Sequence, residues 1–161
     1  MKTNILALFA ILATVFYSCQ KDPSTKEPVD YSKLVTIKQG VWGSCTYLTG
    51  DCMPMVGGNS SCKSEPVKRT IYIYASTADT QAVKIGTSFY SQINTTLIAQ
   101  TQSADNGFFQ ISLQPGKYSV LVLEQGKFYC MDWGDPNLLA PLTINSNATT
   151  KRDVVIDMAV H

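Results

Sequence analysis

The side chains that most often carry catalysis are sparse in this 161-residue chain. Its only histidine, His161, is the last residue, and chain ends are usually poorly ordered. A Ser-His-Asp or Cys-His nucleophile needs a positioned base, so hydrolases of that kind are not expected. A set of aspartates remains as candidates for acid–base chemistry or calcium binding, namely Asp51, Asp79, Asp105, Asp132, Asp135 and Asp157. Most of them lie in expected turns, where aspartate bonds its own backbone, so we predict no enzyme and no catalytic residue.

The first eighteen residues have the composition of an export signal. Met1 to Asn4 carry one cation, Lys2, and residues 5–16 then contain no charge and mainly apolar side chains. A membrane-spanning helix needs roughly 20 apolar residues, whereas a secretory signal needs about a dozen after a basic start. We therefore predict a signal peptide over residues 1–18.

The residues before Cys19 suggest how this signal ends. The sequence "FYSC" resembles a bacterial lipobox, in which the cysteine becomes lipidated and forms the mature N-terminus. The resemblance implies lipidation of Cys19 and a membrane partner contacted through acyl chains, because two or three chains give stable anchoring. A secreted product without lipid is the alternative.

The polar segment that follows has the composition of a tether. Residues 20–30, "QKDPSTKEPVD", are polar and contain two prolines, so residues 19–33 are expected to form the lipidated cysteine and a flexible linker. This segment also resembles the export signals of surface lipoproteins of Gram-negative bacteria. The expected location is the outer membrane or cell surface, with a periplasm-facing protein as the alternative.

Four cysteines remain beyond Cys19, namely Cys45, Cys52, Cys62 and Cys130. Outside the cytoplasm an even count indicates two disulfides, with three possible connectivities. Cys52 and Cys62 flank a Gly- and Ser-rich loop, so we predict that they pair with each other and that Cys45 pairs with Cys130. No C-x-x-C pair occurs, and oxidising conditions oppose free thiolates, so no metal site is expected.

Residues 34–161 have the length of one domain and the patterning of an all-β protein. Charges nearly cancel, which gives no basic stripe for nucleic acid. In "RTIYIYA", residues 69–75, strict alternation places two isoleucines on one face and two tyrosines on the other. Further strands are expected over 35–47, 97–102, 109–113, 118–122, 142–144 and 153–158. Short strands separated by turns predict an antiparallel β-sandwich, transthyretin-like or immunoglobulin-like.

The central segment carries a family resemblance. "TQSADNGFFQISLQPGKYSVLV", residues 101–122, resembles carboxypeptidase regulatory-like, transthyretin-like domains, which share a G-x-F-x-I strand, a Pro-Gly turn and a G-x-Y-x-V strand. "GVWGSCTYLTGDCMP" and "DVVIDMA" resemble secreted lipoproteins that carry this domain. The resemblance covers most of residues 40–159 and implies a fold, because the matched residues are structural and fold alone does not specify function.

Binding is most readily placed in loops at one end of such a sandwich. Met53, Met55, Tyr129 and Trp133 are candidate ligand-contacting residues in "MPMVGG" and "YCMDWGDPNLLAP", and packing in the core or loop is the alternative role. We expect a lipid-anchored, non-catalytic binding or scaffolding module without cofactor, with a glycan as ligand. The alternative is a structural or assembly partner of an envelope protein complex.

Overall fold

The computed structural model describes residues 29–54, 57, 60–130, 132–134 and 136–161. The predicted signal peptide, the lipidated Cys19 and Met55 lie outside these residues. In the described part of the chain, no helix has the length and apolar character needed to cross a bilayer. Its helical content is two 3₁₀ turns, η1 (Tyr31–Leu34) and η2 (Asp79–Gln81).

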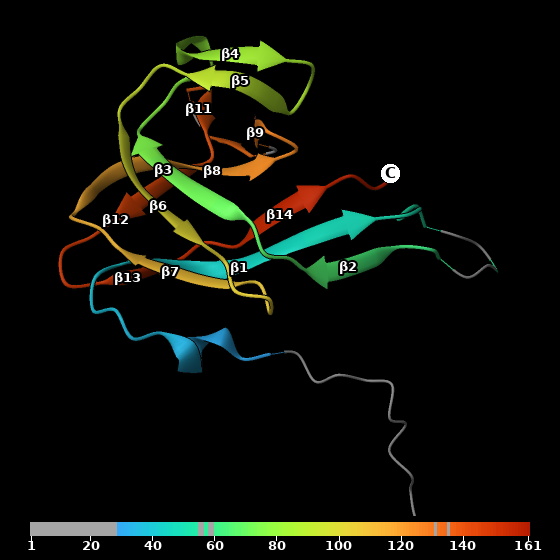
Figure 1. Cartoon of the computed structure of the whole chain (residues 1–161), viewed down its shortest axis with the longest axis horizontal. Helices are drawn as coiled ribbons and strands as arrows, with labels where there is room; N and C mark the ends of the chain where they lie inside the picture. The colour runs from blue at the N-terminus through green and yellow to red at the C-terminus, as the bar shows by residue number, and fades with distance from the viewer. Residues whose placement is uncertain (1–28, 55–56, 58–59, 131, 135) are drawn as a thin grey trace, which may run out of the picture.

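Two β-sheets make up the fold (Figure 1). The smaller sheet is built around the long first strand, which pairs antiparallel with two strands on one side and parallel with two on the other. Its five strands are β1 (Gly40–Thr49), β2 (Lys63–Pro66), β7 (Phe108–Ser112), β13 (Thr149–Lys151) and β14 (Val154–Asp157).

The larger sheet is antiparallel and has the strand order β4-β5-β9-β8-β3-β6, with β12 also paired to β8. Its seven strands are β3 (Thr70–Ala75), β4 (Ala82–Ile85), β5 (Phe89–Ile93), β6 (Leu97–Gln102), β8 (Gly116–Glu124), β9 (Lys127–Tyr129) and β12 (Pro141–Ile144). A separate two-stranded ribbon consists of β10 (Trp133–Gly134) and β11 (Leu138–Leu139).

The larger sheet buries apolar side chains on both faces, because successive residues of its strands point to opposite faces and many on each face are apolar. Ile71 and Ile73 join the main core cluster, which also receives Val41 and Ile156 from the smaller sheet. Tyr74 follows Ile73 directly, so its side chain points to the opposite face of the strand. There it belongs to a second cluster with residues of β5 and of the 130–140 segment. The alternation in residues 69–75 thus predicted the two faces correctly, and the antiparallel β-sandwich is confirmed.

Close approach between β1 and the C-terminal strands depends on a residue without a side chain. A Cβ atom at Gly43 would overlap the carbonyl oxygen of Arg152. The backbone of Arg152 lies there because its N–H donates to the carbonyl oxygen of Trp42, 2.8 Å away. Gly43 therefore lets the chain pass from β13 to β14 while both remain paired with β1.

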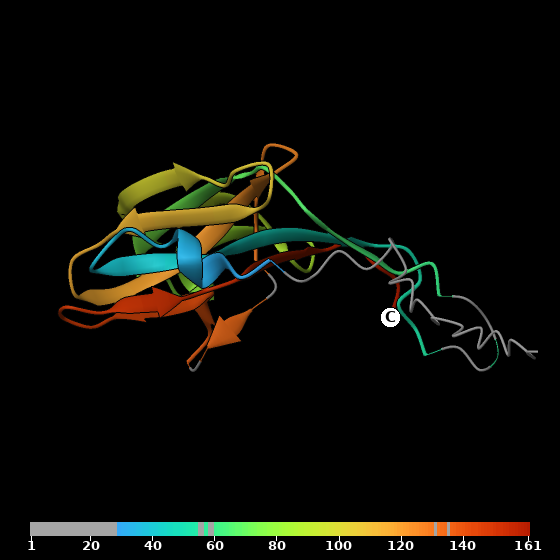
Figure 2. The same cartoon turned by 90° about the horizontal axis from the view of Figure 1, so that it is seen from below.

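One end of the smaller sheet extends beyond the sandwich as an arm, formed by residues 46–52, 60–66 and 157–161 (Figure 2). In β1 the first six residues are mostly buried, whereas Thr46–Thr49 are only half-buried, and all four residues of β2 are exposed. The C-terminal residues run beside the arm, where Cys52 N–H donates to the carbonyl oxygen of Val160 at 2.9 Å. The arm thus has little apolar burial.

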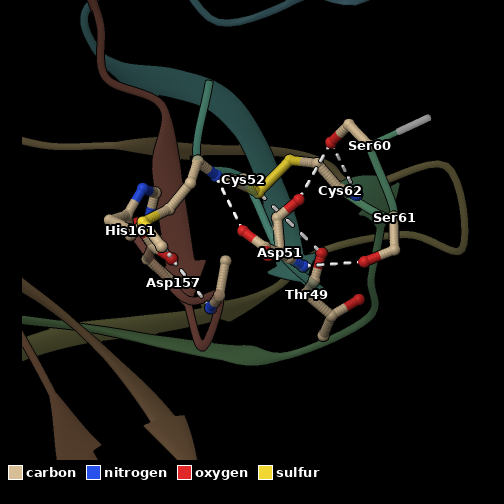
Figure 3. Close-up of a disulfide and its surroundings, with 10 residues drawn as sticks. Thr49, Asp51, Cys52, Ser60, Ser61, Cys62, Asp157 and His161 are labelled. Atoms are coloured by element: carbon tan, nitrogen blue, oxygen red, sulfur yellow. Dashed lines mark hydrogen bonds and ion pairs between the residues drawn. A yellow bond between two sulfur atoms is a disulfide. The ribbon is translucent and has the colours of Figure 1, made fainter. Parts of the chain in front are cut away.

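A disulfide between Cys52 and Cys62 closes the arm, as predicted. Figure 3 shows it with the side chains of Asp51 and Ser60 around it. The hydroxyl of Ser60 donates to the Asp51 carbonyl at 2.9 Å, and the Asp51 N–H donates to the hydroxyl of Ser61 at 2.9 Å. Near the bond, His161 lies 2.9 Å from the carboxylate of Asp157.

The packed part of the chain begins before residue 34. Tyr31, inside the expected tether, stacks on Phe108 with ring centroids 6.0 Å apart, and its hydroxyl donates to the Asn106 carbonyl at 2.6 Å. The 3₁₀ turn that contains it is capped by Asp30, whose carboxylate accepts from Ser32 N–H at 3.2 Å. The last residues of the expected linker are therefore attached to β7.

Candidate functional site

The β10–β11 ribbon places Trp133 on the surface of the larger sheet. Leu139 N–H donates to the carbonyl oxygen of Thr77 at 2.8 Å, and Ala78 and Leu138 form an isolated bridge. Asn137, at the turn between the two strands, has a left-handed φ of 57° and accepts a hydrogen bond from the Asp79 N–H at 2.9 Å. These backbone bonds hold the ribbon against the segment that leads into the β4–β5 hairpin.

A chain of hydrogen bonds then orients the indole ring. Trp133 Nε1 donates to the hydroxyl of Tyr90 at 3.3 Å, and that hydroxyl donates to Asp79 Oδ1 at 2.5 Å. Tyr90 is fully buried, and burial followed by the hydrogen bond to Asp79 raises the pKa of its hydroxyl. The hydroxyl therefore stays protonated and remains able to donate to Asp79. The indole N–H of Trp133 is thus bonded within the protein, while 38% of the residue is exposed.

Polar groups surround the exposed part of the indole. The ammonium of Lys84 lies 5.5 Å from the centre of the Trp133 ring and 3.6 Å from Asp79 Oδ1. Asn137 and Thr87 complete the lining of a hollow of about 330 Å³. Hydroxyl, amide, carboxylate and ammonium groups provide both donors and acceptors beside an aromatic face. This arrangement suits a ligand that has an apolar face and many hydroxyl groups.

No family model, curated protein or solved structure matches the chain. The resemblance to carboxypeptidase regulatory-like domains is therefore an expectation from residues 101–122, and the hollow around Trp133 is described by its own geometry.

Of the other residues predicted to contact a ligand, Tyr129 has a structural role. It is 3% exposed, its ring packs edge-on against Phe89 at 5.2 Å, and its hydroxyl bonds the backbone of Asp157. Met53 is 44% exposed but belongs to the arm, where its N–H donates to Asp51 Oδ1. The structure therefore does not bring Met53 and Tyr129 together with Trp133, and packing is the role it gives to Tyr129.

The predicted disulfide between Cys45 and Cys130 is wrong, because both residues are free thiols. Cys45 lies in the main cluster between the sheets, whereas Cys130 lies in the second cluster with Leu121 and Leu139. Burial raises the pKa of Cys45 to about 11 and also raises the pKa of Cys130, whose thiol donates to the Asp132 carbonyl at 3.1 Å. Both cysteines act as small apolar core residues.

The possibility of a metal site was also considered for the cysteines and aspartates. Among the described residues no group of three or more His, Cys, Asp or Glu side chains is placed to hold a metal ion. Asp132, one of the aspartates in 132–137 considered as a calcium ligand and expected to lie in a turn, pairs with Arg152. Asp135 of the same segment lies outside the described residues.

Sequence reasoning named Asp79 as one of six candidate aspartates but did not place it beside Trp133, and it missed the other residues around the indole. Asp79, Lys84, Thr87 and Tyr90 belong to η2 and the β4–β5 hairpin, a region to which no strand was assigned. A usable signal was present, because Val83 and Ile85 alternate before the turn at Gly86, which has a φ of +76°. That signal predicts the hairpin but not its position beside Trp133.

Proposed function

We propose that this protein is a lipid-anchored, extracytoplasmic binding module of the carboxypeptidase regulatory-like type, and that it binds glycans through the hollow around Trp133. The observation that carries the proposal is the fixed indole, whose Nε1 is bonded to Tyr90 while its ring borders a hollow lined by Asp79, Lys84 and Asn137. The C–H face of a pyranose packs on such a ring, and its hydroxyls bond the surrounding polar groups. The role is non-catalytic.

Preorganisation supports this ligand class. Trp133 needs no rearrangement to present its ring, because the Tyr90 hydroxyl and the ribbon already hold it. An aromatic side chain that is fixed before binding loses little conformational freedom in the complex. Anchoring through Cys19 would keep the hollow close to the cell surface, where glycans are abundant ligands.

The two tryptophans allow a reciprocal test of this proposal. Trp42 also lies beside a lysine, Lys151, with 5.8 Å between ammonium and ring centre, but it is on β1. With excitation at wavelengths that tyrosine does not absorb, the emission of Trp42→Phe comes from Trp133 and that of Trp133→Phe comes from Trp42. After a glycan array identifies a ligand, its addition should change the emission of Trp42→Phe and leave that of Trp133→Phe unchanged.

Removal of the indole ring measures how much Trp133 contributes to glycan affinity. Trp133→Ala should weaken the binding of that glycan about 30-fold or more, as expected for an aromatic anchor worth about 2 kcal/mol. Tyr90→Phe should weaken it less, because the ring stays while the hydroxyl that holds it is lost. Unchanged affinity in Trp133→Ala, or no ligand on a broad array, would reject glycan binding at this hollow.

A further inference from the structure

The outer edge of β14 is an open sheet edge with a hollow beside it. Among the described strands, β14 pairs only with β1. In Figure 1 it runs along β1 toward the C-terminus. A hollow of about 360 Å³ borders this edge and is lined by five residues of the 152–157 segment and by Val120, Tyr129, Cys130, Asp132 and Ala140. It has room for side chains, since a water molecule takes about 30 Å³ of liquid.

Backbone groups of β14 point alternately toward β1 and toward this hollow. Met158 N–H donates to the Leu48 carbonyl at 2.9 Å, so the even-numbered residues face β1. The odd-numbered Asp157 faces away, because its N–H donates to the Tyr129 hydroxyl at 2.8 Å and its carbonyl accepts from that hydroxyl at 3.1 Å. The alternation directs the N–H and carbonyl of Val155 the same way. The Tyr129 hydroxyl therefore occupies the place that a neighbouring strand would take, one step beyond Val155.

The strand at this edge contains neither proline nor lysine, unlike the strand at the opposite edge of the sheet. There β2 carries Lys63, Glu65 and Pro66, and charges and proline discourage pairing with a further strand. The sequence of β14 begins with Val154, Val155 and Ile156, which are β-branched and uncharged. Val155 is 47% exposed. A strand of this composition favours pairing with another extended segment.

Charge around the edge indicates the chemistry of that segment. Asp153 and Asp157 flank Val155 at two-residue spacing, and the hollow contains three carboxylates against one guanidinium, that of Arg152. Asp153 pairs with Lys151 and also accepts from Ser44 N–H at 2.8 Å, and Asp157 lies 2.9 Å from His161. These ion pairs, like that of Arg152 with Asp132, involve partly exposed side chains, so a basic residue of a partner can join or replace them. Antiparallel pairing of two copies centred on Val155 would set Asp153 against Asp157, and like charges in opposed positions destabilise a sheet.

We propose that the outer edge of β14 binds an extended segment of another protein by strand addition, with an apolar residue of that segment in the hollow and a lysine or arginine two positions to either side. The bonds form at the N–H and carbonyl of Val155, and the basic side chains meet Asp153 and Asp157. The surface is separate from the Trp133 hollow and does not rest on glycan binding.

Hydrogen exchange on the full-length chain tests this directly. The probe is acetyl-Lys-Thr-Val-Thr-Lys-amide, and the control is the same peptide with glutamate in place of both lysines. In the free chain the Val155 amide should exchange rapidly while the neighbouring Val154 and Ile156 amides are protected. Saturation with the basic peptide should slow Val155 exchange at least tenfold, and the acidic peptide should bind at least tenfold more weakly. A Val155 amide that is already protected, or equal binding of both peptides, would overturn the proposal.

Two proline variants provide a matched pair. Val155→Pro removes an N–H that faces the hollow, so the chain should fold with an unchanged melting temperature and lose peptide binding at least tenfold. Val154→Pro removes an N–H that faces β1, so it should lower the melting temperature. If Val155→Pro does not fold, the hydrogen-exchange measurement on the unaltered chain still tests whether the peptide binds at Val155. Undiminished peptide binding by folded Val155→Pro would overturn the proposal, as would a dimer that Val155→Pro dissociates, because the occupant would then be a second copy.

Discussion

The smaller sheet runs from the sandwich into the arm, yet different forces stabilise the two regions. In the sandwich, Gly40–Cys45 of β1 contribute to a core formed with Ile71, Ile73 and Ile156. In the arm, the same strand continues through Thr46–Thr49 without a buried residue and is closed by the disulfide between Cys52 and Cys62. Strand pairing alone is marginally stable in water, so a segment that lacks a second layer depends on a covalent link.

The same comparison explains the state of the four described cysteines. Cys52 and Cys62 lie where the arm has no apolar layer, with their Cα atoms 4.6 Å apart. Cys45 and Cys130 lie where apolar packing is already dense, in clusters on the two faces of the larger sheet. The disulfide thus forms in the part of the fold that has little apolar burial, and the two buried thiols pack as apolar side chains.

The largest expected effect is the loss of core volume. Ile73 is fully buried between the sheets, so Ile73→Ala should lower the free energy of unfolding by about 3 to 4 kcal/mol, measured by urea titration. Val160→Ala in the arm removes a residue that is 58% exposed, and it should change that free energy by less than about 0.5 kcal/mol. Similar losses in the two variants would contradict the division between a packed sandwich and an unpacked arm.

Removal of the disulfide should have a smaller and more local effect. Replacement of Cys52 and Cys62 together by serine releases a loop of 10 residues, for which the chain-entropy relation gives at most about 2.7 kcal/mol. Because few side chains of the arm reach the core cluster, among them Tyr47 and Met158, most of this loss should be local opening. Amide exchange should accelerate in residues 46–52 and 60–66 and change little at Ile71 and Val122. Uniform acceleration through the sandwich would show that the arm and the core unfold as one unit.

Ionisation of the buried thiols should have the smallest effect on the free energy of unfolding, and this effect should be measurable only at alkaline pH. Burial raises the pKa of Cys45 to about 11 in the folded chain, whereas an unfolded cysteine titrates near about 8.5. The stabilisation is therefore complete below about pH 8.5 and is lost as the pH rises toward 11, by at most about 1.4 kcal/mol per pH unit for one such group. Urea titrations from pH 7 to 10 should show this decline, and Cys45→Ala should show a shallower one.

Chemical labelling checks the same thiols near neutral pH. Iodoacetamide should leave Cys45 and Cys130 unmodified in the native chain and label both after unfolding without reductant. A Cys45–Cys130 peptide in a non-reduced digest would contradict the structure and restore the pairing expected from the cysteine count.

Local patterns were sufficient for some elements and insufficient for others. The alternation at residues 69–75 predicted a strand with two apolar faces, which β3 is. Strands were also expected on both sides of Pro115-Gly116, and β7 and β8 lie there, but β7 pairs with β1 and β8 with β3, in different sheets. The short separation of Cys52 and Cys62 was enough to predict their bond. Tyr129 was predicted as a ligand contact, whereas its hydroxyl bonds the backbone of Asp157, because nothing local distinguishes a tyrosine that bonds a distant backbone from one that faces solvent.

Sequence alone determined the all-β class, the main strands and the disulfide of the arm, because periodicity, turn chemistry and short cysteine spacing act between residues close in the chain. Tertiary structure decided that Tyr90 and Lys84 lie beside Trp133, that Cys45 and Cys130 remain apart, and that β14 ends the sheet. Those relations join residues tens of positions apart, and they follow from how the two sheets curve and pack, which no local pattern encodes.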